Sequence, residues 1–247
     1  MLQNYNNFLN YATFFCLPFV LFIFFTTFAP RILRRLYCLR SLSTQEYMIK
    51  NIIFDFGRVL VDWNQHYLYD PYFGSKEKTD WFIQHICTIE WNNQTDVGKT
   101  FAQAIAEKTA EFPEWEKEIR MYGDQWIQMI GNPIPGMYEW ILRLKQDGYS
   151  IYGLTNWSTE TFPLVRHRFP VFDLLDGIVM SGEEKIAKPD HRIYHILLSR
   201  YQLSPHECVF IDDNAHNIAA AQALGIHGIQ FFSAEQAQQA FHALEHA

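Results

Sequence analysis

The sequence predicts an α/β fold in which a doubly wound parallel sheet carries an all-helical cap, inserted after the first strand. Short runs rich in Ile, Val and Phe recur along the chain, as in strands that are buried on both faces of a parallel sheet. Helical patterns alternate with these runs, which favours right-handed crossovers between parallel strands. Between residues 62 and 132 the alternation stops and the pattern is helical. The 247 residues therefore suit one sheet domain with one insertion.

The core elements are expected in a regular order. The predicted strands cover residues 51–54, 150–154, 177–180, 208–211 and 227–230. The predicted helices cover residues 137–147, 190–201, 215–224 and 234–245. Gly148 and Gly225 follow two of these helices, at the position where glycine commonly ends a helix. Ligands of such sheets bind beyond the carboxyl ends of the strands, so the polar residues there form the candidate site.

Residues 62–132 are predicted to form the cap, and residues 48–61 and 133–247 the core. The clearest helical signal in the cap is one apolar stripe with helical spacing. It consists of Trp115, Ile119, Tyr122, Trp126 and Met129. Further helices are expected over residues 99–111 and 80–88. Because an insertion at the carboxyl edge of a sheet can cover a bound ligand, we interpret the cap as a lid.

Residues 1–47 form a separate hydrophobic segment. Residues 8–28 are almost continuously apolar and would span roughly 32 Å as a helix, about the thickness of the hydrocarbon core of a bilayer. Four arginines follow within residues 31–40 and would keep the rest of the chain in the cytoplasm. The alternative is an over-extended reading frame, since Met48 directly precedes the first strand. Both hypotheses place the catalytic body in the cytoplasm.

Charge and cysteine content exclude some classes of function. The net charge is −7, and residues 1–47 hold four arginines and one acidic residue, so the other 200 residues carry 16 basic and 26 acidic side chains. An acidic body argues against nucleic acid as a partner, because phosphate backbones require clustered Lys and Arg. The four cysteines, at positions 16, 38, 87 and 208, are scattered without a CxxC motif. We interpret them as reduced thiols and expect no structural zinc.

Four polar segments, three of which end or follow predicted strands, predict a phosphoryl-transfer site. They are Asp55-Phe56-Gly57, Thr155-Asn156, Lys188-Pro189 and Asp212-Asp213. Together they offer a nucleophilic carboxylate, a hydroxyl, an ammonium group and further carboxylates. Each segment alone is also compatible with a turn or a helix cap. Their occurrence in this order is what indicates an enzyme.

With these motifs, residues 49–232 resemble the haloacid dehalogenase superfamily, and within it the phosphatases with a helical cap and a Rossmann-like core. The resemblance implies that Asp55 is the nucleophile and Lys188 the residue that offsets the negative charge of the site. It implies that Thr155 and Asn156 hold the phosphoryl oxygens. It also implies Mg²⁺ as the cofactor, with ligands from Asp55, the Gly57 carbonyl and Asp213.

Three positions depart from the family pattern. Position 57 usually carries a second Asp, the general acid and base, whereas Gly57 has no side chain that can move a proton. Three alternatives follow. The substrate could have a good leaving group, as for the sugar-1-phosphate phosphatases that this motif resembles. Asp62, His66 or Asp212 could act as the general acid and base instead, or the protein could be catalytically weak. Near Asp213, Asn217 replaces an acidic residue of the family pattern and Asp212 replaces a glycine. Both are expected to support the magnesium ligands indirectly.

Substrate contacts are expected in the cap and its hinges. The candidates there are Asp62, Trp63, Asn64, Trp91 and Asn92, which could stack on a sugar and bind its hydroxyls, although both tryptophans could equally be cap core. The predicted function is a Mg²⁺-dependent phosphatase for a small phosphomonoester such as a sugar phosphate. The alternatives are a 2-haloacid dehalogenase, disfavoured by the extra charges of Asp212 and Asp213, and a non-catalytic binding protein. A membrane partner is expected only if residues 8–28 are an anchor, and the oligomeric state stays open.

Overall fold

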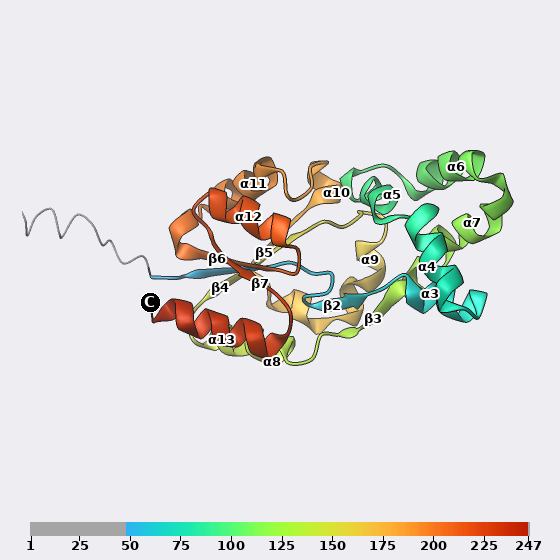
Figure 1. Cartoon of the computed structure of the whole chain (residues 1–247). Helices are drawn as coiled ribbons and strands as arrows, with labels where there is room; N and C mark the ends of the chain where they lie inside the picture. The colour runs from blue at the N-terminus through green and yellow to red at the C-terminus, as the bar shows by residue number, and fades with distance from the viewer. Residues whose placement is uncertain (1–47, 247) are drawn as a thin grey trace, which may run out of the picture. The chain divides into compact units, whose positions relative to one another are not determined.

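The computed structural model describes residues 48–246 and contains a five-stranded parallel sheet. Its strands are β1 (Asn51–Phe54), β4 (Ser150–Thr155), β5 (Gly177–Met180), β6 (Cys208–Asp212) and β7 (His227–Gln230). They lie side by side in the order β5-β4-β1-β6-β7, with β1 at the centre (Figure 1). The chain extends the sheet to one side of β1 and then to the other, as in doubly wound folds. The predicted fold class is confirmed.

Helices cover both faces of the sheet (Figure 1). The helices of this part are α8 (Met137–Gln146), α9 (Phe162–Val165), α10 (Ser181–Glu184), α11 (His191–Tyr201), α12 (Ala215–Ala223) and α13 (Ala234–Glu245). Short 3₁₀ turns lie at η5 (Arg166–Arg168), η6 (Pro170–Leu174) and η7 (Pro205–Glu207). In Figure 1, α11 and α12 lie on one face, and α8 and α13 lie on the other.

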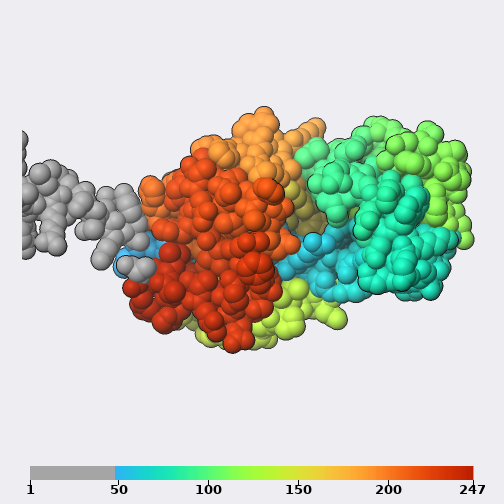
Figure 2. Space-filling model, viewed as in Figure 1, coloured from blue at the N-terminus to red at the C-terminus, as the bar shows by residue number. Residues whose placement is uncertain are grey.

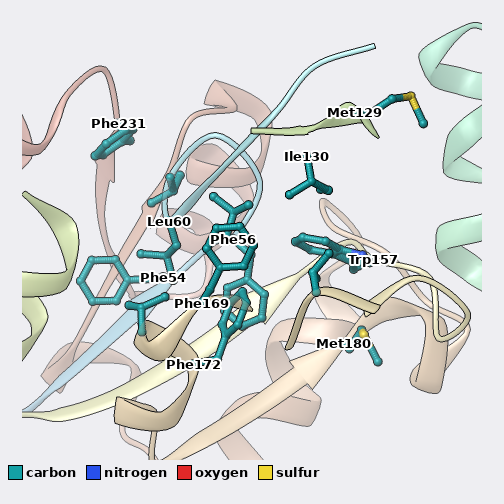
Figure 3. Packing of buried hydrophobic residues seen from close by; sticks show 14 of the residues in the cluster. Phe54, Phe56, Leu60, Met129, Ile130, Trp157, Phe169, Phe172, Met180 and Phe231 are labelled. Carbon is teal, nitrogen blue, oxygen red and sulfur yellow. The ribbon is translucent and has the colours of Figure 1, made fainter. Parts of the chain in front are cut away.

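Alternate residues of β1 enter two separate apolar clusters. Ile52 and Phe54 pack with the side of the sheet that α8 and α13 cover, whereas Ile53 packs with residues of α11 and α12. All three are completely buried, which explains the continuous apolar run of this strand. The first cluster continues from Phe54 and Phe56 to Trp157 and toward the inserted segment at Met129 (Figure 3). The base of the insertion is therefore packed onto the sheet domain by apolar contacts.

The insertion begins and ends with two strands, β2 (Val61–Trp63) and β3 (Ile130–Pro133), which pair as a short antiparallel ribbon. Between these strands lie α3 (His66–Phe73), α4 (Lys76–His85), α5 (Ile89–Asn93), α6 (Phe101–Glu111) and α7 (Glu116–Asp124), with 3₁₀ turns at η2 (Thr95–Val97), η3 (Pro113–Trp115) and η4 (Trp126–Met129). Figure 2 shows the teal and green surface of these elements beside the orange and red surface of the C-terminal half. Helices dominate this segment, as expected, but the ribbon was not predicted.

One expectation about the insertion is wrong. The apolar stripe from Trp115 to Met129 does not form one helix, because α7 ends at Asp124 and the chain continues through η4 into β3. Ile119, Tyr122 and Trp126 are buried nevertheless. The stripe therefore predicted burial correctly for four of its five residues, Trp115 being half-buried, and it predicted helix continuity incorrectly.

Within residues 48–246, no helix has both the length and the apolar character that a membrane crossing requires. The predicted anchor at residues 8–28 lies outside the described residues. Two of the four cysteines, Cys87 and Cys208, lie within the described part and are free and buried.

Candidate active site

The carboxyl ends of β1, β4 and β6 bring the predicted site residues together. Because β1 pairs in parallel with both β4 and β6, Asp55 follows β1 between Thr155, at the end of β4, and Asp212, at the end of β6. The backbone N–H of Asp55 donates to the carbonyl of Ile211 and fixes its position beside β6. β4 and β6 flank β1 on opposite sides, and doubly wound sheets bind ligands at the carboxyl ends of strands where the strand order reverses in this way.

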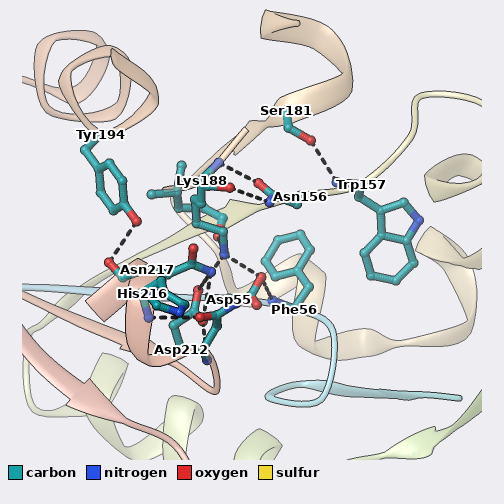
Figure 4. A network of polar contacts seen from close by, with 12 residues as sticks. Asp55, Phe56, Asn156, Trp157, Ser181, Lys188, Tyr194, Asp212, His216 and Asn217 are labelled. Carbon is teal, nitrogen blue, oxygen red and sulfur yellow. Dashed lines mark hydrogen bonds and ion pairs between the residues drawn. The ribbon is translucent and has the colours of Figure 1, made fainter. Parts of the chain in front are cut away.

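Lys188 lies at the centre of this group and is almost completely buried (Figure 4). Its Nζ is 2.8 Å from Asp55 Oδ1 and 2.7 Å from Asp212 Oδ2, and it also donates to the Leu154 carbonyl at 2.8 Å. These three acceptors match the three donors of an ammonium group. Burial alone would lower the pKa of Lys188, but Asp212 and Asp55 outweigh it, so its pKa lies above the ordinary value. Lys188 is therefore a fixed positive charge.

The Asp55 carboxylate is held by two donors on one oxygen. Oδ1 accepts from Lys188 Nζ and, at 2.7 Å, from the backbone N–H of Phe56. Among the described residues, Oδ2 accepts no hydrogen bond, so this oxygen can meet a ligand. Burial raises the pKa of Asp55 to about 7 and the charge of Asp212 adds to this, while Lys188 opposes it.

Asp212 is completely buried and acts on the site through Lys188. Besides the ion pair, its carboxylate accepts from the backbone N–H of Asn214 at 2.7 Å. It also accepts from Asn217 Nδ2 at 3.1 and 3.0 Å (Figure 4). Both oxygens are therefore engaged, and Asn217 lies where it supports Asp212.

Asp213 is more accessible than Asp212 and faces the cavity. Carboxylate oxygens of Asp55, Asp212 and Asp213 lie within 4.8 Å of one another. The ion pair of Asp213 with Arg58 Nη1 is long, at 4.0 Å. The N-cap of α12 is Asn214, whose side chain accepts from the backbone of His216, so Asp213 is not required as a helix cap. Burial raises the pKa of Asp213, the charge of Asp212 adds to this, and Arg58 and Lys188 oppose it.

Thr155 and Asn156 differ in how they are satisfied. The Thr155 hydroxyl is buried and has no hydrogen-bond partner among the described residues, which is unusual for a buried polar group. The Asn156 side chain instead donates to the Lys188 carbonyl at 3.0 Å and accepts from the Lys188 backbone N–H at 2.9 Å. Asn156 thus fixes the backbone that carries the lysine, and Thr155 retains an unused donor.

A cavity of about 230 Å³ opens above these groups, between the sheet domain and the insertion. Asp55, Gly57, Asn156, Lys188, Asp213 and Asn217 line its base. Trp63, Ile89, Trp126 and Trp157 supply apolar walls, and Arg58, Asn92, Asn93, Asp96, Thr161 and Asn214 supply polar ones. Trp63 and Asn92 are therefore at the cavity, where the sequence predicted substrate contacts.

Three other predicted substrate residues are placed elsewhere, and we correct that expectation. Trp91 is buried in the inserted segment, packs against Tyr122 and donates from Nε1 to the Ala104 carbonyl. The Asp62 carboxylate accepts from the Tyr67 hydroxyl, and Asn64 Oδ1 accepts from the backbone of His66. None of the three lines the described cavity.

The sequence interpretation missed Arg58, Asp96, Trp126 and Trp157 as cavity residues. Arg58 has a positive φ of 61°, which few residues other than glycine adopt and which turns the loop after β1 back toward β2. Because Arg58 directly follows the Asp55-Phe56-Gly57 segment, its place at the cavity could have been predicted. Trp126 and Trp157 pack together across the domain junction, with ring centroids 6.0 Å apart. Asp96 carried no local signal.

Comparisons with known proteins agree with this arrangement. A family model described as haloacid dehalogenase-like hydrolase matches residues 31–225. The chain is 30% identical over 186 residues to a sesquiterpene phosphatase of Aspergillus oryzae, which covers 73% of this chain and 88% of that protein. It is 23% identical to a D-ribitol-5-phosphate phosphatase of Bacteroides thetaiotaomicron, over 74% of this chain and 92% of that protein.

A solved structure shows the same fold. It is a haloacid dehalogenase family enzyme of Bacteroides thetaiotaomicron in complex with magnesium and inorganic phosphate. The superposition has a TM-score of 0.60 at 23% identity and covers 75% of this chain and 95% of that one.

Proposed function

The chain belongs to the haloacid dehalogenase-like hydrolases, and on that premise we propose that it hydrolyses a small phosphomonoester with Mg²⁺ as cofactor. One observation carries the proposal, namely the polar cluster at the carboxyl ends of β1 and β6. There three carboxylates approach within 4.8 Å of one another, and Lys188 Nζ lies 2.8 Å from Asp55. Such a cluster combines a nucleophile, hard oxygen ligands and a fixed positive charge.

In the proposed reaction, an oxygen of the Asp55 carboxylate attacks phosphorus and forms an aspartyl-phosphate, which water then hydrolyses. The Lys188 ammonium stabilises the negative charge that collects on the attacked group. The unpaired Thr155 hydroxyl and the backbone N–H of Asn156 are the donors that we assign to the phosphoryl oxygens. The ion pair with Asp212 holds Lys188 in place.

The residues present fit a magnesium ion. Asp55, Asp213 and the Gly57 carbonyl line one cavity and offer hard oxygen atoms, the ligand type that Mg²⁺ prefers. The long ion pair of Asp213 leaves its oxygens available, whereas Lys188, Asn214 and Asn217 engage those of Asp212. When bound, the ion would neutralise part of the phosphate charge.

Removal of the metal tests this assignment. We expect phosphate release from a panel of sugar, polyol and alkyl phosphates in the presence of Mg²⁺, loss of that release with excess EDTA, and recovery when Mg²⁺ is restored. The measurement is inorganic phosphate against time. Turnover that EDTA does not affect, or halide release from 2-haloacids without phosphate release, would contradict the proposal.

The cavity bounds the substrate. At about 230 Å³ it is smaller than the roughly 300–1,000 Å³ usual for ligand sites, which favours a small metabolite. Its aromatic walls and its polar side chains, Asn92, Asn93 and Thr161, suit a sugar or polyol phosphate, whose ring or chain packs on Trp while its hydroxyls are bound. The phosphate of an apolar alcohol is the second candidate, favoured by Trp63, Trp126 and Trp157 and by the similarity to a sesquiterpene phosphatase.

Thr155→Val separates a phosphate-binding role from a structural one. Val has nearly the same shape, and an unsatisfied buried hydroxyl costs about 1–3 kcal/mol, so the unliganded variant should be at least as stable as the wild type. Loss of one donor to the phosphoryl group should lower kcat/KM by on the order of 10²-fold. Urea denaturation and steady-state kinetics measure the two effects. A variant that is both less stable and fully active would remove Thr155 from the site.

A further inference from the structure

The proposed reaction needs a proton at the leaving oxygen, and the residues suggested by the sequence do not supply it. Gly57 has no side chain. Asp62 is bonded to Tyr67, His66 is paired with Asp70 and Asp80, and the Asp212 carboxylate is enclosed by its partners. A proton donor must therefore come from another element that reaches the cavity.

Asp96 is the one carboxyl group that the insertion places in the lining of the described cavity. It lies in η2, and its side chain is largely buried, with 9% of the residue exposed. The Ser181 hydroxyl donates to the Asp96 carbonyl, and that same hydroxyl accepts from the backbone N–H of Trp157. Ser181 begins α10 of the sheet domain, so this contact fixes η2 against the domain that carries Asp55.

Two further contacts orient the Asp96 side chain. Asn92 Nδ2 donates to Asp96 Oδ2 at 3.1 Å, and the Tyr122 hydroxyl donates to Asn92 Oδ1 at 2.8 Å. Asn92 thus links Tyr122 to Asp96, with its amide oxygen toward Tyr122 and its amide nitrogen toward Asp96. Gln65 Nε2 donates in turn to the Tyr122 hydroxyl oxygen at 3.4 Å. A buried carboxyl held by a fixed chain of donors is pre-organised in the way that a catalytic group requires.

We propose that Asp96 is the general acid and base of this enzyme, in place of the side chain that Gly57 lacks. The inference rests on the proposed phosphatase function. As the bond between phosphorus and the ester oxygen breaks, the Asp96 carboxyl transfers its proton to that oxygen and the alcohol leaves. The resulting Asp96 carboxylate then accepts a proton from the water that attacks the aspartyl-phosphate, which releases hydrogen phosphate and restores the Asp96 carboxyl group and the Asp55 carboxylate.

The surroundings of Asp96 suit this role. Burial raises its pKa to about 7, and the negative charge of Asp55 adds to the rise, while the backbone N–H of Ser158 opposes it. The charged and titratable groups around it are Asp55, Asp213, Arg58 and Lys188 in the cavity lining, Tyr122 behind it, and Lys185 packed near Gly98. A carboxyl with this pKa is protonated in part of the enzyme at neutral pH, as a general acid must be.

The leaving group distinguishes catalysis from structure. With an alkyl phosphate, Asp96→Asn should lower kcat/KM by about 10²–10⁴-fold, because the alkoxide needs a proton. With p-nitrophenyl phosphate, the first step needs no proton, so the variant should release a burst of nitrophenol close to one per active site and then turn over slowly. The burst also shows that the variant is folded. On the alkaline side of about pH 7, wild-type kcat/KM for the alkyl phosphate should decline as Asp96 loses its proton, and the variant should lack that decline.

A second substitution adds a rescue. A Cβ built on Gly57 meets no atom within 4 Å, so Gly57→Asp can place a carboxyl in the same cavity. In the Asp96→Asn background it should restore part of the alkyl phosphate turnover. Asp124→Asn, at an exposed position of the insertion, is the matched control and should behave as the wild type.

Two results would overturn the inference. The first is wild-type turnover of the alkyl phosphate by Asp96→Asn, and the second is an equal loss with both esters and no burst. Failure of the proposed function itself looks different, because the wild-type enzyme would then release no phosphate from either ester with Mg²⁺.

Discussion

Asp55→Asn is expected to reduce phosphate release by on the order of 10⁴-fold or more, the largest effect that we predict for a single side chain. An amide cannot attack phosphorus, so no aspartyl-phosphate can form. The change is nearly isosteric, and the amide oxygen can keep the bonds that Oδ1 accepts from Lys188 and Phe56. The loss should therefore be chemical and not a consequence of unfolding.

Two measurements check this result. Phosphate release with Mg²⁺ gives the rate, and the intact mass of acid-quenched enzyme gives the covalent adduct, which should appear in the wild type and be absent from the variant. Asp147→Asn, exposed at the C-terminus of α8, is the control and should retain full activity. If Asp55→Asn kept a tenth of the wild-type rate, Asp55 would not be the nucleophile.

The sheet domain was predictable because burial on both faces of a parallel sheet forces long apolar runs. The structure has β1, β5 and β7 over the residues that the sequence indicated, and α13 begins at Ala234 and ends at Glu245 as expected. β4 and β6 each extend one residue further, to Thr155 and Asp212, so that polar residues belong to the ends of the strands themselves. The order of these elements also brought the site residues to one edge.

The insertion was less predictable because its apolar residues serve two surfaces. Ile119 and Tyr122 pack inside the insertion, whereas Trp126 turns to meet Trp157 of the sheet domain. Helical spacing alone does not distinguish these two destinations. The break between α7 and η4 lies just before Trp126, whose contact depends on the position of the sheet domain.

Asp96 shows what a sequence pattern cannot reveal about a site. The lack of a side chain at Gly57 is visible in the sequence, but any element that folds over the cavity can supply a replacement. Residues 55 and 96 are brought together by the packing of η2 on α10. The hydrogen bond from the Ser181 hydroxyl to the Asp96 carbonyl is part of that packing. No local motif around Asp96 encodes that contact.

Lys188→Met is expected to affect both stability and activity, because it leaves Asp55 and Asp212 buried without their shared cation. Breaking a buried ion pair from one side costs about 3–5 kcal/mol, which corresponds to a fall in Tm of roughly 6–20 °C for a protein of this size. The Leu154 carbonyl also loses its donor. Turnover should disappear, since no other group that contacts Asp55 carries a positive charge among the described residues.

A second substitution separates these two effects. In Lys188→Met/Asp212→Asn one buried charge is gone, and the amide oxygen can still accept from the Asn214 backbone. Most of the lost stability should return while activity stays absent, because Lys188 is needed in the reaction and Asp212 mainly holds it. Thermal unfolding in EDTA measures stability without metal, and Lys50→Met, which removes an exposed pair with Glu207, should change it by less than about 1 kcal/mol. If Lys188→Met alone were as stable as the wild type, the two buried carboxylates would not depend on the lysine. Another group would then have to balance their charge.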